Sequence, residues 1–335
     1  MATKPAVAVL GGGAWGTVLA TVAARHGHDV ALWEIDRAAA DALARDRTSG
    51  RSVPHFRLPA EVAVSSDIGA AIAGRDMLVV AVPSAFVAAT MQAVTSARPS
   101  NTAALVVCAS KGLEPETGAT MADVIAANLR GARVSVLSGP SFAAEIARGL
   151  PAALVVAAAD PEVGAEVQGC FGGDRIRIYT SDDVTGVCLG GALKNVVAIA
   201  VGCCDGFGFG DNARAALITR GLAEMGRLAE RMGGHAMTLA GLAGLGDLVL
   251  TCTGDLSRNR QVGLALARGD ALADILGRLG HIAEGVGTAR IARDLAQRVG
   301  VEMPITREVA AVLHDGKPPR VAVNDLLARD IGAER

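Results

Sequence analysis

This sequence of 335 residues has few aromatic side chains, almost no net charge and no metal-binding cysteine motif. Only 3% of the residues are aromatic although 51% are hydrophobic, so the cores must be built from Ala, Val, Leu and Ile. The 32 basic and 34 acidic side chains leave a net charge of −2, which supplies no field that would attract nucleic acid or an anionic membrane non-specifically. We therefore expect no nucleic-acid partner, and any basic site must be local.

Zinc-binding and disulfide patterns are lacking as well. No CxxC occurs, and no His lies beside a cysteine at the spacing of zinc ligands. We expect no metal site, and we interpret the cysteines as buried, reduced thiols. They are Cys108, Cys170, Cys188, Cys203, Cys204 and Cys252.

Two uncharged runs are long enough to span a bilayer, for which about 20 apolar residues suffice. The first, residues 5–24, follows Lys4 like the apolar part of a signal peptide, but four glycines in its middle would weaken such a helix. The second, residues 77–97, contains Pro83 and several Ser and Thr residues, and it divides into a strand, a turn and a helix. The sequence thus predicts a cytoplasmic protein without stable membrane insertion.

Short apolar runs alternate with Ala-rich helical segments up to about Ser181. Continuous apolar strands separated by helices are typical of a parallel sheet covered on both faces. At about 150 residues per domain, the length suggests two domains. We predict a doubly wound, Rossmann-like α/β domain over residues 1–182 and an all-α domain over residues 183–335, where strand signals fade. The predicted strands are 6–10, 30–33, 77–82, 103–108, 134–137, 153–156 and 175–179, and the later helices include 213–232, 259–266, 271–279, 287–299 and 305–313.

The first predicted strand runs into GGGAWG, residues 11–16, and then into a helical segment, which places GxGxxG at Gly11, Gly13 and Gly16. In this context the first glycine allows the tight turn, the second lets a pyrophosphate approach the backbone, and the third lets helix and strand pack closely. Free N–H groups at the helix start then bind the phosphates. The pattern predicts a dinucleotide site; the alternatives are a turn that binds nothing or a site for another nucleotide-like ligand.

The end of the second strand bears on the choice of cofactor. Glu34 lies 18 residues after Gly16, close to the ~20 expected of an acid that bonds the adenosine ribose hydroxyls. Arg37 is the counterargument, because its guanidinium could pair with a 2′-phosphate. The cofactor is therefore NAD or NADP, with Glu34 favouring NAD.

Ligands of open parallel sheets lie beyond the carboxyl ends of the strands, so the loops there should carry reactive groups. Three such loops bear polar residues, at 83–84, 110–114 and 138–142. Lys111 is the only cation between residues 99 and 113. Many lysines only aid solubility, but the place of Lys111 predicts a role at the reactive end of the cofactor.

Two further polar features stand out in the predicted helical half. Lys194 interrupts an uncharged run, and a buried ammonium needs an anionic substrate or an acidic side chain as partner. The alternative is a lysine whose stem extends to water, with Asn195 as a helix hydrogen-bonder. Ser257 could cap a helix and aim backbone N–H groups, Arg258 and Asn259 at one phosphate; an ordinary capped helix with exposed arginines is the other interpretation.

Motifs along nearly the whole chain carry a family resemblance. The chain resembles the bacterial NAD(P)-dependent glycerol-3-phosphate dehydrogenases in GGGAWGT, ASKGLE, LSGPSFAAEIARGLPAA, GGALKNVVAIAVG, GFGDNARAALITRGLAEM, GLAGLGDLVLTCT, SRNR and AEGVGTA. The resemblance implies an oxidoreductase that interconverts dihydroxyacetone phosphate and sn-glycerol 3-phosphate with NAD(P)H and supplies glycerol 3-phosphate for phospholipid synthesis. At LWEIDR many relatives have a basic or histidine residue where Glu34 and Ile35 stand, which weakens an NADP preference.

The resemblance also implies roles for individual residues. Lys194 is the expected catalytic acid/base, with Lys111 and Asp247 as its catalytic neighbours. The residues expected to bind the substrate are Lys111, Gly139, Ser141, Lys194, Asp247, Ser257, Arg258 and Asn259. The glycine motif and the second strand already indicate Gly11, Gly13, Gly16 and Glu34 as cofactor-binding residues. To these the resemblance adds Ala14, Trp15, Lys111, Ala143, Arg258, Ile282 and Glu284.

The expected chemistry follows from the movement of charge. Hydride transfer to the ketone places negative charge on the carbonyl oxygen, which needs a nearby proton donor, and Lys194 is the expected donor. The phosphate, held by Arg258 and the helix start at Ser257, would position the carbonyl from a distance.

Two rival functions stay open on the sequence. Another two-domain dehydrogenase, acting on a hydroxy acid or a sugar derivative, would share the cofactor half but need no phosphate grip. A catalytically silent dinucleotide-binding sensor would bind the cofactor without hydride transfer. The small-residue helices of the second half could, in addition, bury a homodimer interface.

Overall fold

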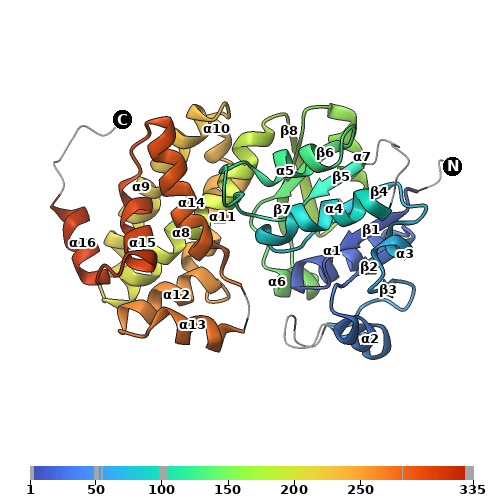
Figure 1. Ribbon diagram of the computed structural model, residues 1–335, viewed down its shortest axis with the longest axis horizontal. Coiled ribbons are helices and arrows are strands. Elements are labelled where there is room, and N and C mark those ends of the chain that lie inside the picture. Colours follow the sequence, from blue (N-terminus) through green and yellow to red (C-terminus); the bar gives the residue numbers. More distant parts are fainter. Residues whose placement is uncertain (1–3, 49–52, 54–55, 98–104, 281, 329–335) are drawn as a thin grey trace. The chain divides into compact units, whose positions relative to one another are not determined.

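The computed structural model describes residues 4–48, 53, 56–97, 105–280 and 282–328, which fall into two compact units (Figure 1). The first unit comprises residues 1–111 and 119–188, and the second comprises residues 112–118 and 189–335. The short segment Gly112–Gly118 therefore belongs with the second unit, although both of its flanks belong with the first. Each unit has its own hydrophobic core.

An eight-stranded sheet forms the centre of the first unit, in the order β3-β2-β1-β4-β5-β6-β7-β8. All neighbouring strands are parallel except β6 and β7, which are antiparallel. The prediction of a doubly wound α/β fold with a parallel sheet is confirmed, and the pair β6–β7 departs from it, because an apolar run does not indicate strand direction. The strands are β1 (Val7–Leu10), β2 (Val30–Trp33), β3 (Ala63–Ser65), β4 (Met77–Val80), β5 (Leu105–Cys108), β6 (Arg133–Ser138), β7 (Ala152–Ala158) and β8 (Ile176–Ser181).

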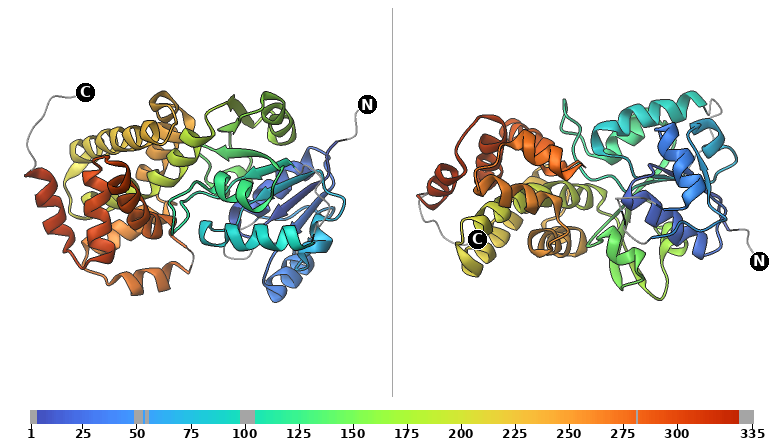
Figure 2. Two further views of the ribbon diagram at one scale, coloured as in Figure 1. Left: turned by 45° about the horizontal axis from the view of Figure 1, so that its top comes forward. Right: turned by 90° about the horizontal axis from the view of Figure 1, so that it is seen from below.

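Helices cover both faces of the sheet (Figure 2). On one face α1 (Ala14–Arg25) contacts α6 (Ala143–Ala147) and α7 (Pro161–Phe171). On the other, α4 (Val87–Ala97) contacts α3 (Ile68–Ile72) and α5 (Met121–Asn128). The strand order reverses between β1 and β4, and the loops that follow these two strands meet at the switch point where such sheets bind ligands.

The second unit is helical, as predicted, and is built round α8 (Val184–Gly206). Leu193 and Val197 of α8 pack in one core cluster, whereas Val196 and Ile199 pack in another, so α8 is enclosed on several sides. The other helices are α9 (Gly210–Arg231), α10 (Ala236–Leu239), a π-helical turn (Leu242–Gly246), α11 (Asp247–Thr253), α12 (Arg258–Ala267), α13 (Leu272–Leu279), α14 (Glu284–Val299), α15 (Pro304–His314) and α16 (Pro319–Leu327).

Two helical stretches pass a test of length and hydropathy for a membrane span, Val184–Gly206 and Ala236–Thr253. The first is buried throughout by the rest of the protein and is a core helix. The second is not one regular α-helix, because the π-helical turn divides it. The two runs singled out in the sequence, residues 5–24 and 77–97, each divide into a strand and a helix as predicted.

All six cysteines are buried with free thiols, which confirms their interpretation as core residues. Burial raises the pKa of four of them, Cys170, Cys188, Cys203 and Cys252, to about 12. These thiols are therefore protonated at neutral pH and unsuited to metal binding or nucleophilic attack. Within the described ranges, no group of three or more His, Cys, Asp or Glu side chains could hold a metal ion.

Candidate active site

The glycine-rich turn joins β1 to α1. Gly11 has a φ of 120°, and a Cβ at this position would lie 2.8 Å from the carbonyl oxygen of Ala81, just after β4. A Cβ at Gly16 would overlap the carbonyl oxygen of Gly11, so close packing of helix on turn requires glycine. Around Gly13, which precedes α1, a Cβ would meet nothing within 4 Å. The turn therefore leaves room for a phosphate against the N–H groups at the start of α1.

Ala14, Trp15 and Ala143 lie at the starts of α1 and α6 and pack against the core of the sheet unit. The buried indole Nε1 of Trp15 has no hydrogen-bond partner within the described part of the chain. Buried donors are rarely left unpaired in folded proteins unless a ligand or water completes the site. The glycine turn, the helix start and this indole together fit a dinucleotide.

Glu34 follows β2 and borders the same turn. One carboxylate oxygen accepts the N–H of Gly12 at 3.1 Å, and the other accepts the N–H of Asp36 at 3.1 Å. Asp36 caps α2 (Arg37–Asp46), which begins with the exposed Arg37. The carboxylate of Glu34 therefore lies between the end of β2 and the glycine turn, the place where an acid is expected to bond the adenosine ribose in folds of this type.

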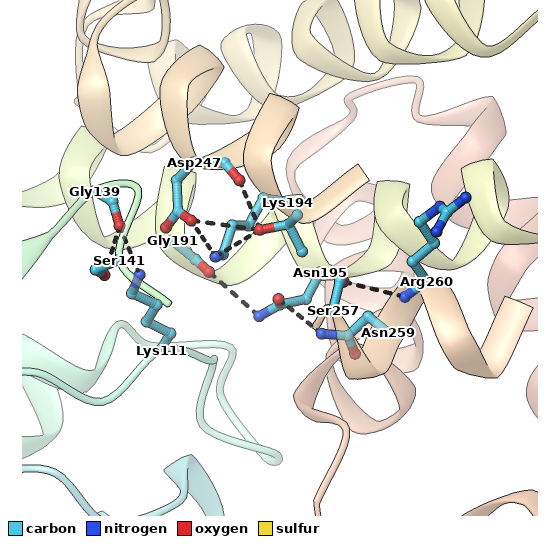
Figure 3. Close-up of polar contacts among 11 residues, drawn as sticks. Lys111, Gly139, Ser141, Gly191, Lys194, Asn195, Asp247, Ser257, Asn259 and Arg260 are labelled. Atoms are coloured by element: carbon cyan, nitrogen blue, oxygen red, sulfur yellow. Dashed lines mark hydrogen bonds and ion pairs between the residues drawn. The ribbon is translucent and has the colours of Figure 1, made fainter. Parts of the chain in front are cut away.

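Lys111, Gly139 and Ser141 come together after β5 and β6 (Figure 3). The Lys111 ammonium donates to the Gly139 carbonyl at 3.3 Å, and the Ser141 hydroxyl donates to the same oxygen at 2.8 Å. Gly139 has a φ of 124°, and a Cβ there would lie 3.1 Å from Leu154 Cα, so the close turn requires glycine. The adjacent Ser138 hydroxyl is buried without a partner among the described residues.

Lys194 lies on α8 and is only 7% exposed. Its ammonium is ion-paired with Asp247, which is 1% exposed, and donates to the Thr251 hydroxyl at 2.9 Å (Figure 3). The Thr251 hydroxyl in turn donates to the Asp247 backbone carbonyl at 2.6 Å. The lysine is thus buried with an acidic partner, and its stem does not extend to water. A buried ammonium held in this way has a fixed position from which it can donate a proton.

Asp247 reaches Lys194 because the glycine-rich segment that precedes Asp247 approaches α8 closely. A Cβ at Gly190, one turn before Lys194, would lie 2.6 Å from the Ala243 carbonyl oxygen. Asp247 then begins α11, and Thr251 follows four residues later on the same face of that helix. Sequence reasoning missed Thr251, although its spacing from Asp247 would have indicated it once the helix was recognised.

The start of α12 carries the predicted phosphate-binding residues. The Ser257 hydroxyl accepts the N–H of Arg260 at 3.2 Å, so Ser257 caps the helix as predicted. The Asn259 amide is buried; it donates to Asn195 Oδ1 at 2.8 Å and accepts the N–H of Gly285 at 3.0 Å. These bonds use the amide oxygen and one of the two N–H donors of the Asn259 side chain.

Arg258 is solvent-accessible but partly surrounded by protein. This desolvation lowers the pKa of its guanidinium, while the charge of Glu284 at the start of α14 acts in the opposite direction. Ile282, two residues before Glu284, is 44% exposed. Arg258 is therefore the side chain of this turn that remains available to an anion.

Comparisons with known proteins agree on one family over both units. Residues 6–164 match the NAD-dependent glycerol-3-phosphate dehydrogenase N-terminus, and residues 183–324 match the C-terminus of the same enzymes. The chain belongs to the NAD-dependent glycerol-3-phosphate dehydrogenase family. Its activity is that of an NAD(P)-dependent glycerol-3-phosphate dehydrogenase, as the resemblance implied.

Similar proteins span nearly the same length as this dehydrogenase. This chain is 50% identical over 326 residues to the glycerol-3-phosphate dehydrogenase of Aromatoleum aromaticum. The alignment covers 97% of this chain and 98% of that protein. The chain is 48% identical over 330 residues to that of Solidesulfovibrio magneticus, with 98% and 99% covered. The crystal structure of glycerol-3-phosphate dehydrogenase from Coxiella burnetii superimposes with a TM-score of 0.94 at 38% identity, covering 97% of this chain and 99% of that one. The match over both halves of the dehydrogenase decides against the rival functions left open by the sequence.

Proposed function

We propose that this dehydrogenase reduces dihydroxyacetone phosphate to sn-glycerol 3-phosphate with Lys194 as the proton donor to the carbonyl oxygen. The observation that carries the proposal is the buried Lys194 ammonium, which is held by Asp247 and Thr251 in the middle of a largely apolar helix. Such a group is costly to bury, so its retention is explained best by chemistry that needs it.

The proton and the charge balance in this scheme. NAD(P)H, when bound, would supply a hydride, which is one proton with two electrons, to the carbonyl carbon. The carbonyl oxygen gains negative charge as the double bond becomes single, and Lys194 transfers one proton to it. Asp247 and Thr251 keep the ammonium oriented, and in the reverse direction the neutral amine accepts the hydroxyl proton.

The remaining residues position the substrate and the cofactor. Arg258, the first N–H groups of α12 and its cap Ser257 hold the phosphate, whose binding energy orients the carbonyl. Lys111 adds positive charge to substrate and cofactor beside Gly139 and Ser141. In this proposal residues 1–182 bind the dinucleotide and residues 183–335 bind the substrate and carry the catalytic lysine.

Cofactor preference is proposed to be for NAD. The carboxylate of Glu34 bonds to the glycine turn, so a 2′-phosphate placed there would meet a negative charge. Arg37, at the start of α2, is the one nearby cation named from the sequence that could offset this repulsion.

The cellular role is proposed from the family. A soluble enzyme of this activity in the cytoplasm would supply glycerol 3-phosphate for phospholipid synthesis. A homodimer stays a prediction, based on the small-residue helices of the second unit.

The test is a comparison of initial rates with dihydroxyacetone phosphate and with dihydroxyacetone, each with NADH and with NADPH. We expect rapid oxidation of the reduced nicotinamide with the phosphorylated ketone only, and a lower KM for NADH than for NADPH. Equal rates with dihydroxyacetone would contradict binding of the substrate through its phosphate, and a lower KM for NADPH than for NADH would contradict the proposed preference for NAD.

A further inference from the structure

The far end of α8 carries an acid with a buried side chain, Asp205, which is 5% exposed. One carboxylate oxygen accepts Arg214 Nε of α9 at 2.8 Å. The other accepts Arg260 of α12, from Nε at 2.9 Å and from Nη2 at 2.8 Å. Arg260 also bonds to Asp255 at 3.0 Å, just before α12. The carboxylate therefore joins three helices through charge-assisted bonds.

Three consecutive side chains at the start of α12 thus have three different surroundings. Arg260 turns toward Asp205, and Asn259 turns toward Asn195 and the N–H of Gly285. Arg258 makes no salt bridge within the part of the chain that the structure describes, and it is accessible to solvent. Because consecutive residues on a helix point about 100° apart, fixing Arg260 and Asn259 also fixes the direction of Arg258.

Helices α8 and α12 meet through glycine, which leaves little room for adjustment. A Cβ at Gly202 of α8 would overlap the Arg260 carbonyl oxygen, and a Cβ at Gly263 of α12 would overlap the carbonyl oxygen of Ile199. Backbone-to-backbone contact sets the distance between the helices but allows one to slide along the other. The Asp205–Arg260 ion pair, at the end of this contact, resists such sliding.

We propose that Asp205 and Arg260 are positioning residues that hold the start of α12 in register with the helix that carries Lys194. Asp205 lies 11 residues after Lys194, about three turns along α8 and on the same side of it. The pair thereby sets the position of the Arg258 guanidinium and of the α12 N–H groups relative to the Lys194 ammonium. This inference rests on the proposed role of Arg258 in holding the substrate phosphate.

The test separates binding of the phosphate from the rest of catalysis. Arg260→Lys keeps the positive charge but loses the forked contact with Asp205, and Asp205→Asn keeps the shape but loses the charge. For both we expect the KM for dihydroxyacetone phosphate and the inhibition constant of inorganic phosphate to rise about tenfold or more, as for loss of a charge-assisted contact. The KM for NADH should stay within about twofold, and the slow turnover of dihydroxyacetone, which has no phosphate, should be unchanged.

Arg214→Gln is the matched control, because it removes the other partner of Asp205 without touching α12. We expect it to leave the phosphate readouts within about twofold of those of the wild type. Equal losses with dihydroxyacetone and its phosphate in the Arg260→Lys variant would overturn the inference, and so would an unchanged inhibition constant for phosphate.

Failure of the underlying proposal has a different signature. If Arg258→Ala leaves the KM for dihydroxyacetone phosphate and the phosphate inhibition constant unchanged, then Arg258 does not hold the phosphate. If Arg258→Ala raises both but Arg260→Lys raises neither, the proposed function stands and the positioning role is wrong. Thermal unfolding of each variant verifies that the conservative changes leave the fold intact.

Discussion

At the residue scale, the ion pair between Lys194 and Asp247 should affect stability as well as the proposed proton transfer. Lys194→Ala should lower kcat by about 10² to 10⁴, the usual contribution of a general acid. It also leaves the Asp247 carboxylate buried without its cation, which should lower the free energy of unfolding by about 3–5 kcal/mol. Steady-state rates and urea denaturation measure the two effects.

The double variant Lys194→Ala with Asp247→Asn distinguishes them. Because it removes both charges, it should recover most of the stability while remaining inactive, with NADH binding retained. Turnover close to that of the wild type in either variant would exclude Lys194 as the proton donor.

Glu34 is the second residue whose role can be isolated. Glu34→Gln keeps a hydrogen-bonding group beside the glycine turn but removes the negative charge that we propose would repel a 2′-phosphate. We expect the KM for NADPH to fall several-fold and that for NADH to rise modestly, since a neutral acceptor bonds a ribose hydroxyl less strongly than a carboxylate does. Parallel changes for the two cofactors in initial-rate measurements would remove Glu34 as the determinant.

At the element scale, the contact between α8 and α12 depends on glycine. Alanine at Gly263 would overlap the Ile199 carbonyl oxygen and come within 2.7 Å of Cys203 N, so the helices would have to separate. We expect a loss of roughly 1–3 kcal/mol in stability and a raised KM for dihydroxyacetone phosphate. Gly277 of α13 is the control, because a Cβ there meets nothing within 4 Å. Gly277→Ala should raise the free energy of unfolding by up to about 1 kcal/mol, and with it the thermal midpoint. A Gly263→Ala variant as stable as the wild type would contradict the close packing.

The individual strands and helices also show which parts of the structure could be predicted from the sequence. Strands β1, β2, β4 and β5 are buried on both faces, and their continuous apolar runs indicated them. Strand β3 has only three residues at the sheet edge, partly exposed, and left no such signal. The capped start of α12 could be read from Ser257, whereas the bond between Asn195 and Asn259, 64 residues apart, depends on how α8 and α12 pack. Local patterns predict elements and caps, but partners distant in sequence arise only from packing.

For the whole molecule, buried Glu224 of α9 links stability to pH. Its carboxylate accepts the N–H groups of Ile305 at 2.6 Å and Thr306 at 3.1 Å, at the start of α15. Burial nevertheless raises the pKa of Glu224 from its ordinary value of 4.5 to about 7, although these donors act in the opposite direction. Between these two values the folded protein holds a proton that the unfolded chain releases.

Folding stability should therefore be greatest, with respect to this group, below pH 4.5 and should fall as the pH rises through 7. The loss is on the order of 3 kcal/mol for a shift of this size. Glu224→Gln cannot titrate, so the difference in unfolding free energy between wild type and variant should change across this window, whereas the exposed Glu230→Gln on the same helix should give a constant difference. Urea denaturation at several pH values between 4 and 8 measures both differences. If the Glu224→Gln curve runs parallel to that of the wild type, the carboxyl of Glu224 has the same pKa in the folded and the unfolded protein, and burial does not raise it.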